Sequence, residues 1–363
     1  MLYNNSLKLL TMTALLAMVV SCAPTYEKAK IDMVWPLPPD EPRIQYVDTI
    51  RSTLDVGMKT GAADVLFGGE QTQAMTKPYG VAVDSKGVIY VTDPGRVFVF
   101  DLHNKSYGFI GMDPGQGKLA FPIGIAASAD GRLYVTDVSQ DRVFVYRENK
   151  YIAAVGQKGE FEGPSGVAVD DMRGLVYVAD AKKHHVIVYS SKDYAKIRTI
   201  GVRGTAEGEF NYPTNIALDA EGKLYVVDSG NFRVQIFDAE GKFLRAMGKL
   251  GDTPGSLARP KGIAVDSEGH IYVVDTAFAN IQIFDKEGNL LLAVGGHGDP
   301  PGKFWLPAGM AIDHQDRLYV VDQYPGLVQI FQYLGEKWKK AGVASEGLGT
   351  KEKVPARSRS SSF

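Results

Sequence analysis

The stretch from Pro260 to Phe284, "PKGIAVDSEGHIYVVDTAFANIQIF", decides the fold of this chain. It contains three short apolar runs that are separated by two turn-like breaks. Five further copies of the pattern lie at 78–100, 122–146, 164–189, 213–237 and 307–331. The Asp that closes the second run recurs at steps of 44, 43, 48, 47 and 47 residues, as Asp93, Asp137, Asp180, Asp228, Asp275 and Asp322. A fixed period of this length predicts a repeat architecture.

The copy that begins at Pro213 indicates how each unit folds. Its first run, "NIALD" at 215–219, has almost no polar residue, which is typical of a strand buried on both faces. Two further strands are expected at 223–228 and 233–237, and a fourth within 239–248. A meander of four antiparallel strands cannot bury both of its own faces. Six such sheets arranged radially can, and they leave no long edge exposed.

The repeated pattern "P-x-G-I-A-V-D … G-x-I-Y-V-V-D … N-x-R-V-Q-I-F" resembles the NHL repeat, and its six copies cover residues 78–331. The resemblance implies an all-β protein, a six-bladed β-propeller whose blades are four-stranded antiparallel sheets. A strand-like segment, "RIQYVDTI" at 43–50, precedes the first copy, and we expect it to complete the last blade as its outermost strand. The alternative is that "WKKAG" at 338–342 supplies that strand.

The domain limits follow from these segments. We place the propeller at residues 43–342. Residues 343–363 have little apolar surface to bury and are expected to form a disordered tail. Residues 22–42 form a Pro-rich tether with the sequence "WPLPPDEP", which favours an extended, semi-rigid spacer. The alternative is that Trp35 and its neighbouring prolines pack against the side of the propeller.

The N-terminus predicts a membrane anchor. Residues 7–20 are apolar, too short to span a bilayer comfortably, and typical of a signal peptide. The run ends in "VVSC" at 19–22, which resembles a bacterial lipoprotein signal. The resemblance implies that residues 1–21 are removed and that Cys22 is the lipid attachment site. The next residue is Ala23 rather than Asp, which resembles the signal that sorts lipoproteins to the outer membrane. We therefore expect a lipid-anchored protein of the bacterial cell envelope, most consistent with the outer membrane.

Charge and cysteine content exclude several classes of function. The net charge is −2, residues 1–21 carry only Lys8, and the segment 335–363 carries +4, so the body between has a charge of −7. An acidic body argues against nucleic acid as a partner. Cys22 is the only cysteine, so no disulfide within the chain, no thiolate metal site and no covalent haem attachment is expected.

Repeated carboxylates and scattered histidines are the candidates for chemistry. We expect the six Asp residues that close the second runs to accept backbone N–H groups from the turns that follow them. A second set ends the first runs and is expected to cap turns, with a single Ca²⁺ site as the alternative: Asp84, Asp170, Asp219, Asp266 and Asp313, with Ser128 in the sixth copy. Zinc catalysis needs about three converging protein ligands. The six histidines lie at unrelated positions of the repeat, so no catalytic residue, metal or cofactor is predicted.

Residues that differ between the copies are the best candidates for binding. The loops that lead into the first strands and those that join second to third strands should share one face. We expect the partner-binding residues on that face to be Tyr79, Lys182, His184, Phe232, Lys261, Phe278, Trp305 and Tyr324. Aromatic side chains beside lysines suit protein recognition. The alternative for Phe232, Phe278 and Trp305 is that they pack between blades.

These observations predict a non-enzymatic, monomeric scaffold that is held on the envelope by lipid and binds a protein. The segment "WPLPPDEPRIQY" at 35–46 resembles the N-terminus of NHL lipoproteins from cytochrome-rich bacteria, which implies redox or cytochrome partners. The alternative function is a metal-dependent hydrolase or lyase, similar to the amidating lyases among NHL propellers, with an ion in the central channel.

Overall fold

The computed structural model describes residues 31–56, 72–157 and 159–340. The predicted signal peptide, Cys22 and the predicted tail lie outside these residues. Within the described ranges, no helix is long and apolar enough to cross a membrane.

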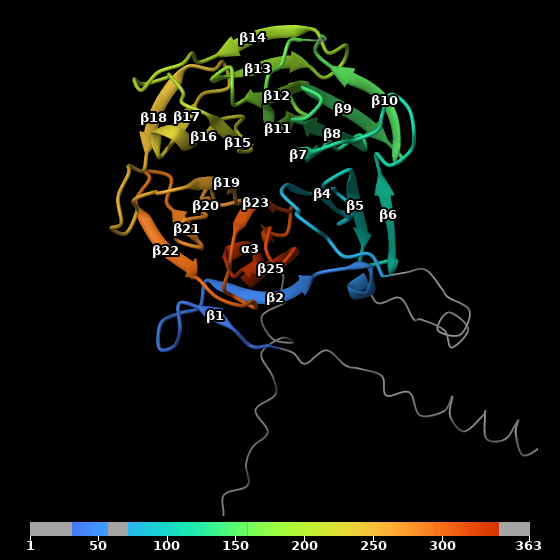
Figure 1. Cartoon of the computed structure of the whole chain (residues 1–363). Helices are drawn as coiled ribbons and strands as arrows, with labels where there is room; N and C mark the ends of the chain where they lie inside the picture. Colours follow the sequence, from blue (N-terminus) through green and yellow to red (C-terminus); the bar gives the residue numbers. More distant parts are fainter. Residues whose placement is uncertain (1–30, 57–71, 158, 341–363) are drawn as a thin grey trace, which may run out of the picture.

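Six antiparallel sheets stand around a common centre, with the first strand of each sheet innermost (Figure 1). Blade 1 consists of β3 (Val81–Val83), β4 (Ile89–Asp93), β5 (Arg96–Asp101) and β6 (Ser106–Ile110). Blade 2 consists of β7 (Pro122–Ala127), β8 (Arg132–Asp137), β9 (Arg142–Arg147) and β10 (Lys150–Val155). Blade 3 consists of β11 (Pro164–Asp170), β12 (Leu175–Asp180), β13 (His185–Ser190) and β14 (Lys196–Ile200).

The second half of the ring repeats this arrangement. Blade 4 consists of β15 (Pro213–Leu218), β16 (Leu224–Asp228), β17 (Arg233–Phe237) and β18 (Phe243–Met247). Blade 5 consists of β19 (Pro260–Val265), β20 (Ile271–Asp275), β21 (Asn280–Phe284) and β22 (Leu290–Gly295). Blade 6 consists of β23 (Pro307–Ile312), β24 (Arg317–Asp322) and β25 (Leu327–Tyr333), extended by β2 (Ile44–Ile50) and β1 (Val34–Trp35). The predicted all-β, six-bladed propeller is confirmed.

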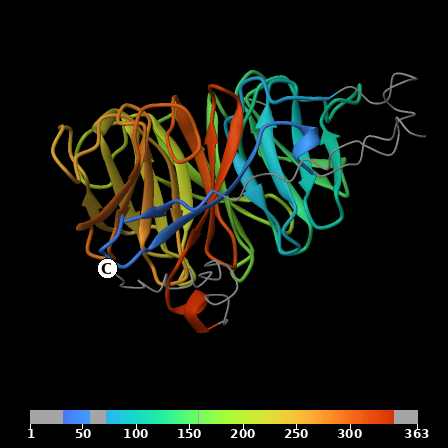
Figure 2. The ribbon, with the colours of Figure 1, turned by 90° about the horizontal axis from the view of Figure 1, so that it is seen from below.

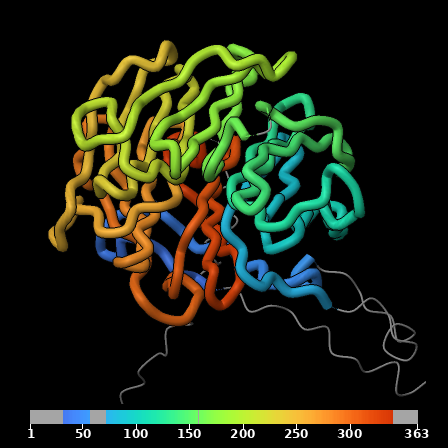
Figure 3. The backbone as a smooth tube through the Cα atoms, turned by 45° about the horizontal axis from the view of Figure 1, so that its top comes forward, coloured from blue at the N-terminus to red at the C-terminus, as the bar shows by residue number. Residues whose placement is uncertain are grey.

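The N-terminal strand β2 closes the ring. It pairs antiparallel with β25, from Ile44 opposite Tyr333 to Ile50 opposite Val328. The backbone tube shows the N-terminal segment alongside the last blade (Figure 3). The expectation that this segment completes blade 6 is confirmed. The alternative segment starts instead in a short helix, α3 (Glu336–Lys340).

Part of the predicted tether belongs to the propeller. Strand β1 pairs with β2 through Val34 and Trp35. The Trp35 ring lies 5.8 Å from that of Phe331, edge to face. Of the two alternatives for Trp35, the structure shows packing, and the ordered blade therefore begins before residue 43. Strand β1 covers the backbone edge that β2 would otherwise expose.

Each blade buries its faces against the next. The core is a set of six apolar clusters between blades, one of which joins Tyr134 and Val145 of blade 2 to Val176 of blade 3. At the centre, a cavity of about 40 Å³ is lined by residues from the innermost strand of each of the six blades. The innermost strands approach so closely that a Cβ on Gly124 would lie 2.2 Å from the carbonyl oxygen of Ser165 in the next blade.

The two faces of the ring differ in their connections. We call the face on which the innermost strands begin, at residues such as Pro260, the loop face; it also carries the connections between second and third strands. The opposite face, which carries the turns after the innermost strands, is the turn face. Figure 2 shows α3 beyond one side of the disc, and its contacts with the turns of blades 5 and 6 identify that side as the turn face.

Candidate functional site

Buried carboxylates at the ends of the second strands hold the loop face in place. Asp275 accepts N–H bonds from Ala258 and Arg259 in the loop that leads into its own blade, and from Ala277 and Phe278 in the turn that follows it. The other five carboxylates each accept at least one N–H from the corresponding leading loop: Asp93, Asp137, Asp180, Asp228 and Asp322. The expected N–H bonds from the following turn are present at Asp137, Asp180 and Asp275. The bonds from the leading loops were not predicted.

The carboxylates at the ends of the first strands cap the turns of the turn face. Asp266 accepts backbone N–H bonds from Glu268 and His270 and the hydroxyl of Tyr272. Its second oxygen lies 2.8 Å from Nδ1 of His270, and this hydrogen bond raises the pKa of the imidazole. In the described part of the chain, no group of three or more His, Cys, Asp or Glu side chains could hold a metal ion.

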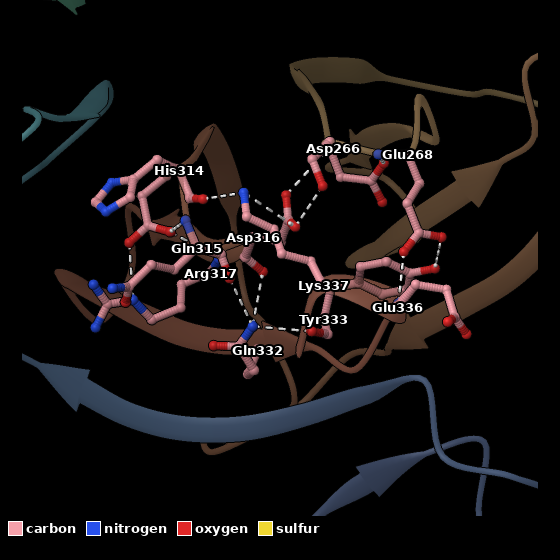
Figure 4. A network of polar contacts seen from close by, with 12 residues as sticks. Asp266, Glu268, His314, Gln315, Asp316, Arg317, Gln332, Tyr333, Glu336 and Lys337 are labelled. Carbon is pink, nitrogen blue, oxygen red and sulfur yellow. Dashed lines mark hydrogen bonds and ion pairs between the residues drawn. The ribbon is translucent and has the colours of Figure 1, made fainter. Parts of the chain in front are cut away.

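The C-terminal helix occupies the turn face over blades 5 and 6 (Figure 4). The carboxylate of Glu268 accepts the Tyr333 hydroxyl at 3.0 Å and the backbone N–H of Glu336 at 2.7 Å. The ammonium of Lys337 donates to the backbone carbonyl of His314. This end of the ring is therefore covered in part by the chain itself.

The central cavity offers little polar chemistry. Four of the six blades contribute a glycine to its lining, while blade 5 contributes Ile263 and blade 4 contributes Asn215 and Ile216. The Asn215 amide donates to the backbone carbonyl of Lys261 at 2.9 Å. With about 40 Å³ of space, the cavity has room for roughly one water molecule rather than a substrate.

On the loop face, blade 6 carries three aromatic rings in contact, which we call the aromatic patch: His297, Trp305 and Tyr324. The Trp305 ring lies 4.5 Å from His297 and 6.3 Å from Tyr324. Its Nε1 donates to Asp299 at 2.9 Å, and Tyr324 is 67 % exposed. Two of the predicted binding residues are thus brought together on an accessible surface.

A second predicted pair lies beside this patch. The Lys261 ammonium lies 5.4 Å from the centre of the Tyr79 ring, within range of a cation–π contact. It also donates to Oε1 of Gln323, which is the neighbour of Tyr324 in the chain, at 3.3 Å. Blades 1, 5 and 6 therefore contribute to one continuous region of the loop face.

The remaining predicted residues lie on blades 3, 4 and 5. His184 is only 6 % exposed, so the expectation that it lies on the surface is wrong. It has a positive φ of 56°, and its ring packs 4.8 Å from Tyr212, whose N–H it accepts. Lys182 is exposed on blade 3, across the ring from blade 6. Phe232 and Phe278 are partly buried on blades 4 and 5.

Sequence reasoning missed two basic residues that complete the region. Lys77 and Arg259 are exposed and directly precede the prolines that begin blades 1 and 5. We call Lys77, Arg259 and Lys261 the basic mouth. Burial, Arg259 and Lys77 together lower the pKa of Lys261 to about 8. A comparison of the six copies could have revealed Lys77 and Arg259, because the other four copies have no basic residue before their first proline. The residues there are Phe121, Gly163, Tyr212 and Leu306.

Known proteins resemble this chain in its repeats and its fold. Residues 204–276 and 267–336 match a family described as a 6-bladed beta-propeller, and residues 161–189 match the NHL repeat. NHL repeat-containing protein 3 of Mus musculus is 35% identical over 100 residues, which is 25% of this chain and 28% of that protein. Protein brain tumor of Drosophila melanogaster is 44% identical over 43 residues, 12% of this chain and 4% of that protein.

Solved structures share the propeller at low identity. Virginiamycin B lyase from Staphylococcus aureus has a TM-score of 0.53 and 14% identity, over 80% of this chain and 89% of the lyase. XC5397 from Xanthomonas campestris, described as a gluconolactonase, has a TM-score of 0.56 and 16% identity, over 79% of this chain and 98% of the gluconolactonase. These likenesses establish the fold alone. The chain spans little more than a quarter of the first curated relative.

Proposed function

Because this chain is an NHL-repeat six-bladed β-propeller, we propose that it acts without catalysis, as a lipid-anchored scaffold of the bacterial envelope that binds a protein on its loop face. The observation that carries the proposal is the aromatic patch beside the basic mouth. Trp, Tyr and Arg are the side chains that most often dominate binding energy at protein interfaces. Here all three types lie on one accessible region, while the turn face over blades 5 and 6 is occupied by α3.

A catalytic role has less support from this geometry. Propeller lyases and gluconolactonases share the fold, but that likeness is at 14% and 16% identity. A metal-dependent reaction in the central cavity would need convergent ligands, and the cavity is lined by glycines, apolar residues and Asn215 rather than by histidines or carboxylates. A redox protein as the partner remains a proposal that rests on the N-terminal resemblance.

Cys22→Ser is expected to release the protein from the membrane. Cys22 lies nine residues before Ile31, so a lipid on it would hold the propeller within about 30 Å of the bilayer surface. Acyl chains on the cysteine would supply the anchor, because each buried CH₂ contributes about 0.8 kcal/mol. In cells of a bacterial host, we expect wild type in the membrane fraction with labelled palmitate incorporated, and the variant in the soluble fraction without label. Equal distribution of both proteins would contradict the anchor.

A photo-crosslinker at Tyr324 tests the binding surface in the native envelope. We expect a crosslinking amino acid at this position to form a discrete adduct with one protein. The same amino acid at Met172, which is 85 % exposed on the turn face of blade 3, should form none. Adding Trp305→Ala should reduce the adduct by about tenfold, as expected for a residue that dominates an interface. Haem in the adduct would identify a cytochrome. Equal labelling from both positions, or none from Tyr324, would count against the proposal.

A further inference from the structure

The basic mouth concentrates positive charge on an otherwise acidic body. Lys77 comes from blade 1 and Arg259 and Lys261 from blade 5. Lys261 reaches across blade 6, because it contacts Tyr79 of blade 1 and Gln323 of blade 6. Blade 6 has the small, fully buried Ala308 at the position that corresponds to Lys261, which leaves room for the longer side chain above it.

Among the described residues, the ammonium of Lys261 has only neutral partners. These are the Gln323 oxygen at 3.3 Å and the face of the Tyr79 ring. Across residues 31–56, 72–157 and 159–340, no ion pair involves Lys77, Arg259 or Lys261. A partly buried charge without a counter-ion is unfavourable, and an added anion would relieve that cost.

The carboxylates that close the second strands of blades 1 and 5 bond to the backbone of the loops that carry these cations and form no ion pair with the three basic side chains in the described part of the chain. Asp93 accepts the N–H of Lys77 at 2.7 Å, and Asp275 accepts the N–H of Arg259 at 3.0 Å. Both carboxylates are buried. They fix the backbone of the two loops from which the exposed cations project, so the points of attachment of these side chains are in place before any ligand arrives. Preorganisation of this kind reduces the entropy lost on binding.

We propose that the basic mouth binds a carboxylate of the protein partner, presented by an acidic peptide segment that lies across blades 5, 6 and 1. This inference rests on the proposed function and names the chemistry of the partner. The carboxylate would accept hydrogen bonds from Arg259 and Lys261, and flanking apolar residues of the peptide would contact the aromatic patch. Arginine matches a carboxylate well, because its planar fork can donate two parallel bonds. The charge of −7 on the body disfavours extended polyanions such as nucleic acids.

The binding should weaken as the pH rises through about 8, where Lys261 loses its proton. The charged groups that face Lys261 are Lys77 and Arg259. Burial raises the pKa of the Tyr79 hydroxyl, which therefore stays neutral. Binding of an anion should in turn raise the pKa of Lys261, because protonation and anion binding are linked.

The test uses the purified full chain and a fluorescent peptide of five glutamates, with a peptide of five glutamines as the matched probe. We expect the glutamate peptide to bind and the glutamine peptide not to bind. Lys261→Met should weaken binding by about tenfold and abolish its dependence on pH near 8. Lys242→Met, at an exposed turn on the turn face of blade 4, should leave both unchanged. Equal affinity of wild type and Lys261→Met, or equal binding of both peptides, would overturn the proposal.

A measurement on wild-type protein avoids any effect of substitution on folding. Lysines can be labelled with ¹³C-methyl groups and titrated by NMR. We expect one resonance with a pKa near 8 that moves upward on addition of the glutamate peptide. An unchanged titration with saturating peptide would overturn the proposal, as would single-stranded DNA binding more tightly than the peptide. If the Tyr324 adduct forms but Lys261→Met leaves it unchanged, the scaffold proposal stands and the carboxylate site fails. If the glutamate peptide binds but no Tyr324 adduct forms, the carboxylate site stands and the scaffold proposal fails.

Discussion

Gly124→Ala is expected to destabilise the propeller by about 3 kcal/mol, because overpacking between rigid strands forces the backbone to move. The added Cβ would lie 2.2 Å from the carbonyl oxygen of Ser165 and 3.0 Å from Oγ1 of Thr136. Neither atom is free to move. The Thr136 hydroxyl accepts the N–H of Gly124 at 2.7 Å and donates to that same Ser165 carbonyl at 2.8 Å, so it links two blades.

The contact cannot be relieved by a shift of one blade. Equivalent glycines approach the next blade at four further junctions, with distances from an added Cβ to a carbonyl oxygen between 2.2 and 2.7 Å: Gly80, Gly166, Gly262 and Gly309. In a closed ring, moving blade 2 away from blade 3 presses it against blade 1. We therefore expect the strain to appear as lost stability rather than as a small local adjustment.

Gly108→Ala is the matched control. Gly108 lies on the outer strand β6, and an added Cβ would meet its nearest neighbours only at 4.0 Å. This substitution should be neutral or stabilising by about 0.5 kcal/mol, since alanine restricts the unfolded chain more than glycine does. Urea denaturation of both variants gives the comparison. If the two free energies of unfolding fall by the same amount, close approach of the innermost strands is not what requires glycine.

The repeats allowed the ring to be predicted because each signal is local and recurs in every copy. The glycine of the innermost strand and the Asp that ends the second strand occupy fixed positions in the pattern. The closing strand was also accessible, since "IQYVDTI" at 44–50 can place Ile44 and Ile50 in apolar clusters. The position of the Pro-rich segment could not be predicted, because its composition permits both a free spacer and the observed packing of Trp35.

The candidate site was predicted only in part, for reasons that lie in its geometry. Trp305, Tyr324 and Lys261 were found because they replace other residue types at variable positions of the repeat. His184 was misplaced because its exposure depends on the packing of Tyr212 over a turn with positive φ, which the sequence does not reveal. Lys77 and Arg259 were missed because they are far apart in the chain and act together on Lys261 only when the ring closes through blade 6.

The buried Asp275 is expected to matter for both stability and binding, because it holds the loop that carries Arg259. Asp275→Asn should lower the free energy of unfolding by about 3 kcal/mol, because buried N–H groups that lose a charged acceptor are costly. The carboxylate is fully buried, and its two oxygens accept from the N–H groups of Ala258, Arg259, Ala277 and Phe278. An asparagine retains one oxygen, and its NH₂ group would face backbone donors that it cannot satisfy.

Asp285→Asn provides the comparison, since Asp285 accepts the N–H groups of Asn289 in an exposed turn where water can replace a lost bond. It should change the urea midpoint little. Asp275→Asn should in addition loosen the loop that carries Arg259, so the glutamate peptide should bind this variant more weakly even under conditions where it is fully folded. A stability loss as small as that of Asp285→Asn would show that the repeated aspartates do not hold the loop face. A large loss with unchanged peptide affinity would show that Arg259 is positioned by other contacts.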